Sequence, residues 1–190
     1  YMATFGVIIS CIIGFTVGTL SFQNKRTTNF MLAVCDIFQT FPSFVYLIPV
    51  MMLFGVTDTS VLIAVVVYAT IPATRYTIEG LRSVPAALHD AASMSGVTKL
   101  QRLMKIEFPL AFPHMMLGLN QTIVFALFMV IIGAFIGTED LGQYILKALS
   151  DKKGAGIGLT LGLCVAFIGL IFDNLIRTWV DQRKKHLGID

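Results

Sequence analysis

Few charged side chains interrupt the long apolar runs of this sequence, and each of them is a candidate for chemistry. Asp36 lies within one such run. A carboxylate inside a membrane segment is a functional candidate by default, because burying its charge in lipid is unfavourable. The alternative is that Asp36 is close enough to the membrane surface to be hydrated or paired with a cation. Both interpretations stay open at this point.

Two pairs of opposite charge are spaced four residues apart in the apolar runs. They are Arg75 with Glu79 and Asp173 with Arg177. In a helix this spacing places both side chains on one face, where they attract each other. Each pair falls near the end of its run. We therefore predict ion pairs near the membrane surface and not a proton relay.

Neither a metal site nor a catalytic site is predicted. Cys11, Cys35 and Cys164 are far apart in the sequence and have no His or Cys nearby, so we expect structural thiols packed among helices. His114 stands alone beside Pro113, and we expect a packed or interfacial imidazole. Because no His, Cys or carboxylates cluster at ligand or nucleophile spacing, we predict that the chain is not an enzyme.

These side chains have to be positioned by membrane helices, because the composition excludes an ordinary soluble core. Of the 190 residues, 56% are hydrophobic and 13% are charged, about half the charged share of a typical soluble domain. One crossing of the hydrocarbon layer takes roughly 20 residues. We predict a single all-α integral membrane domain over residues 1–190 with about five transmembrane helices. They are expected at 2–22, 29–54, 59–80, 110–136 and 157–179.

The first residue is not Met, and we expect an N-terminal segment of the full protein to precede this sequence. Basic residues predict the orientation of the helices, because cytoplasmic loops carry the excess of Lys and Arg. The N-terminus is then outside and the C-terminus cytoplasmic. The cytoplasmic side receives Lys25, Arg26, Arg82, Lys99, Arg102, Lys105, Arg183, Lys184 and Lys185, and the outer side receives Lys147, Lys152 and Lys153. Topology explains these short basic loops, so membrane lipid and no nucleic acid is the expected environment.

The second span contains Pro42 and Pro49, each of which lacks a backbone donor and disfavours a straight helix. A broken helix is tolerated at membrane depth where other helices or a watery cavity satisfy the freed groups. We therefore expect this segment to face the protein interior or a pathway. Polar residues of the fourth span, Asn120 to Thr122, are expected to bond to other helices or to line a passage.

Two further patterns concern packing. Glycines at four-residue spacing predict close approach of helices within the chain; they are Gly14 and Gly18 in the first span and Gly154, Gly158 and Gly162 in the last. The outer loop 137–156 has apolar residues at helical spacing, which predicts a short amphipathic helix that would cover an outward opening. Those residues are Leu141, Tyr144, Ile145, Ala148 and Leu149. The charges Glu139, Asp140, Lys147, Asp151, Lys152 and Lys153 could dock a soluble partner or simply be solvated.

The cytoplasmic loop at residues 84–108 is rich in charge. Pro85 suits a helix start and Gly96 a helix end, which predicts one short helix between them. A second helical piece is predicted from Lys99 to Pro109. Two short helices joined at Gly96 would form an elbow on the cytoplasmic surface. Its first arm has a face with almost no side-chain bulk, which another protein could approach closely. The residues of that face are Ala91, Ala92 and Ser93.

The residues of this loop carry a family resemblance. The order Asp90-Ala91-Ala92, three residues, Gly96, nine residues, Ile106-Glu107-Phe108-Pro109 resembles the "EAA" loop of the membrane subunits of binding-protein-dependent ABC importers. That loop has the pattern E-A-A-x3-G-x9-I-x-L-P. The spacing matches throughout. Asp90 replaces the usual Glu and keeps the charge, and Phe108 replaces the usual Leu and keeps the bulk.

In that family the loop forms a coupling helix that sits in a cleft of the cytoplasmic ATPase subunit. The resemblance implies a type I ABC importer transmembrane domain whose ATPase-coupling residues are Asp90, Ala91, Ala92, Ser93, Gly96, Ile106 and Pro109. It also implies two ATP-binding subunits, a second permease copy forming a homodimer, and an external substrate-binding protein, in a bacterial cytoplasmic (inner) membrane. The sequence has no GxxxxGK[ST] phosphate loop, so ATP and Mg²⁺ are expected on the partner ATPase and no cofactor on this chain.

Three further segments resemble the glycine betaine, proline betaine and choline branch of these permeases: "QTFPSFVYLIPV", "GLNQTIVFALFMVIIGAFIGTEDLGQ" and "GLCVAFIGLIFDNLI". The resemblance implies osmoprotection by import of a quaternary ammonium solute through alternating access. Aromatic faces attract such cations. The candidate pathway residues are Phe41, Pro42, Phe44, Tyr46, Asn120, Gln121, Thr122 and Phe125, with Tyr68 as a further aromatic candidate.

Three alternatives remain open at this point. Permeases for methionine or another amino acid share the loop and a five-span core. A channel or an ATP-independent carrier would instead use Asp36 as its coupling site, and it would not need the elbow at Gly96. An integral-membrane enzyme is the third possibility, and the absence of clustered reactive side chains argues against it.

Overall fold

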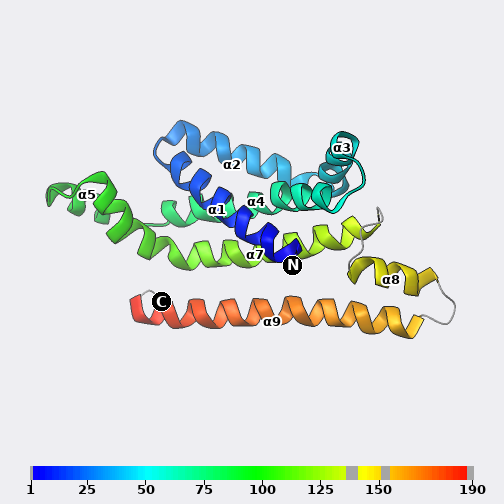
Figure 1. Ribbon diagram of the computed structural model, residues 1–190. Coiled ribbons are helices and arrows are strands. Elements are labelled where there is room, and N and C mark those ends of the chain that lie inside the picture. Colours follow the sequence, from blue (N-terminus) through cyan, green and yellow to red (C-terminus); the bar gives the residue numbers. More distant parts are fainter. Residues whose placement is uncertain (1, 136–140, 151–154, 188–190) are drawn as a thin grey trace.

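The computed structural model describes residues 2–135, 141–150 and 155–187, and within these ranges every regular element is a helix (Figure 1). In chain order the helices are α1 (Met2–Phe22), α2 (Lys25–Thr40), α3 (Phe44–Phe54), α4 (Asp58–Arg82), α5 (Ala86–Met94), α6 (Lys99–Arg102), the π-helical turn η1 (Leu103–Glu107), α7 (Phe108–Ala134), α8 (Leu141–Ser150) and α9 (Ala155–Leu187).

Four of the described helical segments are long and apolar enough to cross a membrane: α1, α4, the segment Lys99–Ala134 and the segment Gly156–Arg183. The pair α2 and α3 is bent by 89°, and it makes a fifth span if the two are taken together. The all-α membrane fold is thus confirmed. The second span, expected at 29–54 with a broken helix, consists of two helices that meet nearly at a right angle.

The break between the two helices follows from the local sequence. A residue that precedes proline is pushed out of the helical region into extended backbone, and Phe41 before Pro42 has φ −73° and ψ 134°. Helix α2 therefore ends at Thr40, and α3 begins at Phe44. Pro49 lies inside α3, which continues past it to Phe54. The expected break in this segment is confirmed at Pro42 and absent at Pro49.

Helix α4 lies between α1 and α7 and packs against both along its length. The approach to α1 is close at two glycines, since a Cβ atom at Gly14 would lie 2.4 Å from the Cβ of Ala73 and one at Gly18 would lie 2.7 Å from the Cβ of Thr77. The predicted packing role of these two residues is confirmed. Gly162 has nothing within 4 Å of its Cβ position, so the prediction is wrong there; Gly154 lies outside the described residues.

The position of helix α9 explains why Gly162 has no close neighbour, whereas Gly14 and Gly18 do. It runs antiparallel beside α7 as a separate layer (Figure 1), and most of its surface is exposed within this chain. Its contacts with the rest of the described chain are made mainly by α7 and α8. Glycines on the faces of α9 that point away from these helices therefore have no neighbour.

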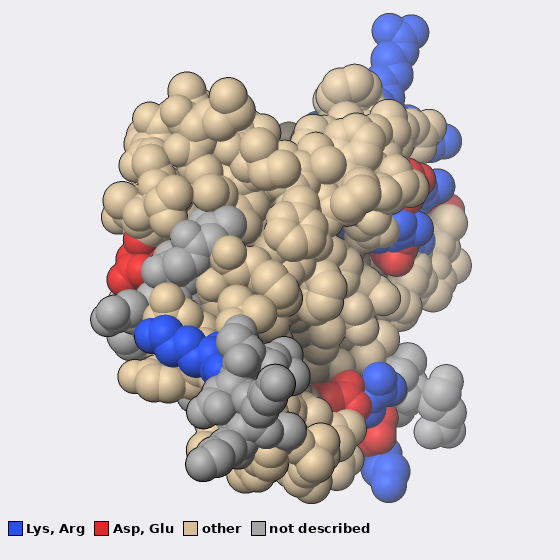
Figure 2. Space-filling model, turned by 90° about the vertical axis from the view of Figure 1, so that its right-hand side faces the viewer, with Lys and Arg blue, Asp and Glu red and all other residues tan. Residues whose placement is uncertain are grey.

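The two ends of the molecule differ. At one end lie the α1–α2 turn, α5 and the last turns of α9, and at the other lie α3 and α8 (Figure 1). Most of the basic residues assigned to the cytoplasm belong to the first end, so the predicted orientation places this end in the cytoplasm. Figure 2 looks at the second end and shows a mainly uncharged surface. Hereafter the first end is called cytoplasmic.

Helix α8 confirms the amphipathic helix predicted in the outer loop. It packs against α7 and α9, with Ala148 buried; Tyr144, predicted on the same apolar face, is exposed. The charged residues Glu139, Asp140, Asp151, Lys152 and Lys153 lie outside the described residues. A covering role for this helix stays a prediction.

Candidate functional site

The elbow at the cytoplasmic end is built by a proline and a glycine. Helix α5 begins directly after Pro85 and ends at Met94. Gly96 then has φ +71°, a left-handed conformation that glycine adopts without the clash of a Cβ atom. The second arm begins at Thr98, whose side chain accepts from the Gln101 backbone while the Gln101 side chain accepts from the Thr98 backbone. This reciprocal cap defines where the new helix starts.

The second arm is not a separate short helix, which corrects the predicted piece ending at Pro109. Residues Lys99–Ala134 form one continuous helical segment, so this arm is the cytoplasmic start of a membrane span. The turn Leu103–Glu107 is π-helical, and the Phe108 amide donates to the Leu103 carbonyl. Pro109 explains the wide turn, because it has no N–H to offer and its ring crowds the carbonyl four residues earlier.

Glu107 holds the two arms of the elbow together. Its Oε1 accepts from Arg102 Nε at 2.9 Å and lies 3.1 Å from Nδ1 of His89 on α5. The Glu107 side chain is buried, at 3% exposure. Sequence analysis missed this carboxylate because it occupies a variable position of the loop pattern. We call these three residues the Glu107 clamp.

The exposed surface of the elbow differs from the predicted small-residue face. Asp90, Ala91, Ser93 and Gly96 are exposed. Ala92 is 5% exposed and faces the chain itself, so its expected place on an open face is wrong. The burial of a single helix position depends on how α5 rotates against its neighbours, which spacing alone does not determine.

Three strongly exposed side chains of the elbow are large and apolar, whereas the prediction expected a surface of small residues. Met94 is 91% exposed, Leu100 68% and Met104 60%. Ile106 and Pro109, two other residues of the loop pattern, are half-buried at the base of the elbow. The elbow therefore exposes two methionines and a leucine at sequence positions that flank Gly96, and a partner that grips the elbow would contact them.

A cavity of about 390 Å³ lies where α2, α4 and α7 meet. We call it the three-helix cavity. It is lined by Gln39, Pro72, Arg75, Tyr76, Glu79, Gln121 and Phe125. Gln121 and Phe125 were predicted pathway residues, and the structure brings both to this cavity. Three lining residues were not predicted: Gln39, Pro72 and Tyr76. Each is three residues from a charged residue that was noticed, namely Asp36, Arg75 and Glu79 respectively, and so shares a helix face with it.

Arg75 is the centre of a polar cluster at this cavity. Its Nε donates to Glu79 Oε1 at 2.9 Å, and its Nη1 donates to Asp36 Oδ1 at 2.6 Å and to Gln39 Oε1 at 2.7 Å. The predicted pair of Arg75 and Glu79 is confirmed. Of the two interpretations of Asp36, the paired one is confirmed. The pair of Asp173 and Arg177, at 2.9 Å, is confirmed as well.

A row of aromatic rings leads from the helix break to the cavity. Consecutive ring centroids are 5.7 Å apart for Phe41 and Phe38, 6.2 Å for Phe38 and Tyr46, 5.0 Å for Tyr46 and Tyr68, and 4.7 Å for Tyr68 and Phe125. The Tyr46 hydroxyl donates to the Phe38 carbonyl. We call these five residues the aromatic row. Neighbours at such distances fix each other's ring orientation.

The other candidate pathway residues lie away from the cavity. Pro42 and Phe44 are exposed beside the helix break. Thr122 is fully buried, and its hydroxyl donates to the Gly118 carbonyl within α7. Asn120 faces α9, where its Nδ2 donates to Asp173. This bond confirms the expected polar contact between helices.

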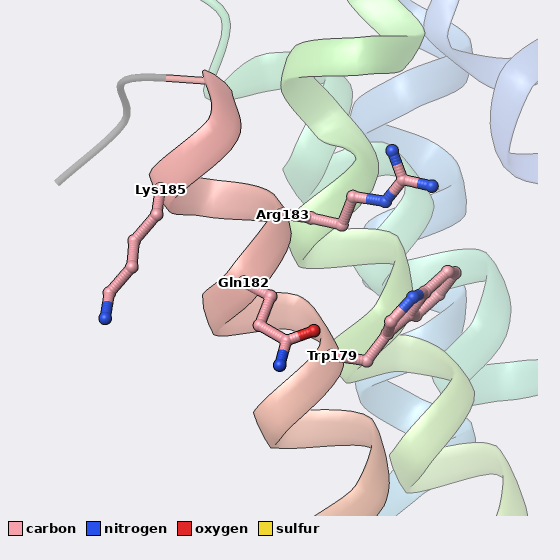
Figure 3. A pocket seen from close by; sticks show the side chains of 4 residues that line it. All are labelled: Trp179, Gln182, Arg183 and Lys185. Atoms are coloured by element: carbon pink, nitrogen blue, oxygen red, sulfur yellow. The ribbon is translucent and has the colours of Figure 1, made fainter.

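A second hollow of about 660 Å³ lies at the cytoplasmic end of α9 and is lined by Trp179, Gln182, Arg183 and Lys185. Figure 3 shows Arg183 directed toward the Trp179 side and Lys185 directed away from it. The Arg183 guanidinium carbon is 5.7 Å from the Trp179 ring centroid. Trp beside basic residues is typical of a membrane surface, and this hollow shares no residue with the aromatic row. Among the described residues, no group of three His, Cys, Asp or Glu could hold a metal ion.

Two curated transport proteins are similar to the chain in sequence. The trimethylamine N-oxide transport system permease protein TmoV of Pelagibacter ubique is 92% identical over 189 residues, which cover 100% of this chain and 26% of that protein. The glycine betaine transport system permease protein OpuAB of Bacillus subtilis is 33% identical over 182 residues, 96% of this chain and 64% of that protein. The chain thus spans about a quarter of the length of the first relative.

A solved structure is similar in fold. The MetNI methionine ABC transporter in an inward-facing conformation superposes with a TM-score of 0.83 and 19% identity, over 96% of this chain and 91% of that chain. Identity at this level establishes the fold alone. Residues 6–186 match the family described as binding-protein-dependent transport system inner membrane component. The elbow, the helical fold and this match together place the chain in the family of binding-protein-dependent transport system inner membrane components.

Proposed function

We propose that the chain forms part of the translocation pathway of an ATP-driven importer for small methylated-amine solutes, such as trimethylamine N-oxide or glycine betaine. Two cytoplasmic ATP-binding subunits, with their ATP and Mg²⁺, would drive it from the elbow. A second copy of the permease and an external substrate-binding protein would complete the complex. The bacterial cytoplasmic membrane is its expected location.

One structural connection carries this proposal. The elbow follows α4 after three residues and continues without interruption into α7. Helices α4 and α7 supply six of the seven residues that line the three-helix cavity. A partner that moves the elbow therefore displaces the walls of the cavity directly. Such a link is what alternating access driven from the cytoplasm requires.

The solute class is supported by the names of the relatives. Trimethylamine N-oxide and glycine betaine each combine a fully substituted cationic nitrogen with an anionic oxygen. Such a nitrogen has no hydrogen to donate and is attracted by aromatic faces. The aromatic row ends with Phe125 at the cavity, which supports a pathway for this chemistry.

The experiment is reconstitution of the full-length permease with its ATPase and binding protein in vesicles. We expect ATP-dependent uptake of labelled trimethylamine N-oxide or glycine betaine, and loss of most uptake for Gly96→Val, because valine strongly disfavours φ +71°. Met52→Val is the control, as Met52 is an exposed residue of α3 away from the elbow. Uptake of methionine alone would contradict the proposed solute class.

The carrier alternative is tested in the same vesicles. Asp36 is bonded to Arg75, and this ion pair accounts for its charge without a coupling role. If Asp36→Asn abolished uptake while Gly96→Val left it unchanged without ATP, an ATP-independent carrier would replace the importer.

A further inference from the structure

The cation at the three-helix cavity lies inside a membrane helix. Arg75 precedes the last residue of α4, Arg82, by about 10 Å along the helix axis. Ionisable residues at such positions are rare, and they mark pathways or binding sites in membrane proteins. Here the Arg75 side chain borders a cavity and is 32% exposed, so a small solute can reach it.

The hydrogen-bond pattern leaves part of this guanidinium available. Nε is used by Glu79, and Nη1 is used by Asp36 and Gln39. Among the described residues, no hydrogen bond uses Nη2. The carboxylates fix the plane of the guanidinium from two helices, and two N–H groups remain on Nη2. They form a pre-oriented donor for an anionic oxygen.

The cluster also has an excess of negative charge. Asp36 and Glu79 carry two negative charges and Arg75 carries one positive charge, so the formal sum is −1. An ion pair whose only role was to join α2 to α4 would need one carboxylate opposite Arg75. Glu79 lines the cavity and its side chain is 39% exposed, so the unbalanced negative charge is open to a cation that enters there.

The aromatic row supplies a surface for that cation. Phe125 lines the cavity and is stacked on Tyr68 with an angle of 19° between the rings. Tyr76 lines the same cavity. Because Tyr68 is itself packed against Tyr46, the Phe125 ring is held in place before any solute arrives. A fixed ring beside carboxylates suits a methylated ammonium.

We propose that the three-helix cavity is a transient binding site for a zwitterion, in which Arg75 Nη2 binds the anionic oxygen while Phe125 and the Glu79 carboxylate hold the methylated nitrogen. This inference rests on the proposed importer function and assigns it a site. The cavity of about 390 Å³ is near the lower end of ligand pockets, roughly 300–1,000 Å³, as suits a small solute.

The first test measures solute transported per ATP hydrolysed by the reconstituted full complex. Phe125→Leu keeps an apolar side chain but removes the aromatic face, and we expect the ratio for trimethylamine N-oxide to fall about tenfold. Glu79→Gln removes the excess negative charge and is also expected to lower the ratio of solute transported to ATP hydrolysed. The matched control is Phe128→Leu, one turn along α7, 52% exposed and outside the cavity lining, which should keep the ratio of the unmodified complex.

The second test does not depend on activity. Gln121→Cys, in a Cys164→Ala background because Cys164 is exposed and the other two cysteines are buried, places a thiol at the cavity. We expect trimethylamine N-oxide to slow its labelling by a water-soluble maleimide at least threefold, and methionine to have no effect. Gln23→Cys, in the exposed α1–α2 turn, should be labelled at the same rate with and without solute.

The outcomes separate the two proposals. If the unmodified complex imports trimethylamine N-oxide but labelling is not slowed, or Phe125→Leu and Glu79→Gln keep the transport ratio, the binding site is rejected and the importer function stands. If the unmodified complex imports no methylated amine, the importer function itself is rejected.

Discussion

At Glu107, one carboxylate oxygen serves two basic side chains from different arms of the elbow, Arg102 and His89. We expect Glu107→Ala to destabilise the protein by about 1.5 kcal/mol, below the roughly 3–5 kcal/mol of a fully buried pair, because both partners are partly exposed. Thermal unfolding in detergent measures this loss. Asp90→Ala, at an exposed neighbouring position, should leave the melting temperature unchanged. Equal melting temperatures for the two variants would mean that Glu107 does not join the arms.

Asn120 makes the corresponding contact inside the membrane, where its Nδ2 donates to Asp173 and links α7 to α9. Polar contacts between membrane helices contribute about 0.6 kcal/mol on average and up to about 1.7 kcal/mol. We therefore expect Asn120→Leu to lower the free energy of unfolding by about 1 kcal/mol. Asn174→Leu, on an exposed face of α9, is the control for added apolar surface. A larger loss at Asn174 would contradict this assignment.

Contacts between residues close in the sequence could be predicted, and contacts between distant residues could not. The pair of Arg75 and Glu79 could be predicted, because a helix brings residues four apart to one face. Asp36 is 39 positions from Arg75, and only the packing of α2 on α4 brings them together. The same holds for Phe125, whose aromaticity was noticed but whose stacking on Tyr68 depends on how α4 meets α7.

At the scale of elements, the contact of α1 with α4 depends on glycine. A Cβ atom at Gly14 would lie 2.9 Å from the backbone N of Thr74 as well as 2.4 Å from Ala73. We expect Gly14→Ala to destabilise the protein by about 1–3 kcal/mol through overpacking. Gly162→Ala should cause no loss, since its Cβ would meet nothing within 4 Å. Thermal unfolding of both variants checks the contrast, and a loss only at Gly162 would overturn it.

The elbow depends on a different property of glycine. Gly96 has a positive φ and open space around it, so a substitution is limited by backbone conformation and not by contacts. We expect Gly96→Asn to keep most ATP-driven uptake, because Asn tolerates this conformation, and Gly96→Ala to lose more, given a strain of about 1 kcal/mol. Uptake by the reconstituted complex gives the order. Greater loss with Asn than with Ala would show that side-chain size, not conformation, is limiting.

Most elements were predictable from hydropathy, proline and glycine, and the failures have two causes. Spans, the break at Pro42 and the helix α8 follow from local sequence. The 89° angle between α2 and α3 and the inward turn of Ala92 do not, because each is decided by neighbours distant in the sequence. The continuity of the elbow with α7 was missed because Pro109 was read as a helix end, whereas a π-turn absorbs it.

At the scale of the whole molecule, the arrangement predicts which surfaces face which compartment. The elbow and the last turns of α9 lie at the end rich in basic residues, and α8 lies at the other. In cells treated with a membrane-impermeant maleimide, we expect Tyr144→Cys to be labelled from outside and Met94→Cys only after permeabilisation. Both side chains are well exposed, at 61% and 91%, and both variants need the Cys164→Ala background. If Met94→Cys were labelled from outside and Tyr144→Cys only after permeabilisation, the orientation would be the opposite and the elbow would not lie in the cytoplasm.

The unbroken helical segment from Lys99 to Ala134 has a mechanical consequence. Its 36 residues extend about 54 Å at 1.5 Å per residue, whereas the hydrocarbon layer is about 30 Å thick. A rod of this length reaches roughly 24 Å past the bilayer, so a tilt of about 10° swings its tip by some 4 Å. The point about which the helix tilts lies within the lipid, and the part that a partner contacts lies in the cytosol. A displacement of the cytoplasmic end by a partner would therefore reach membrane depth along one continuous backbone, with the π-helical turn Leu103–Glu107 as the position at which this helix can bend.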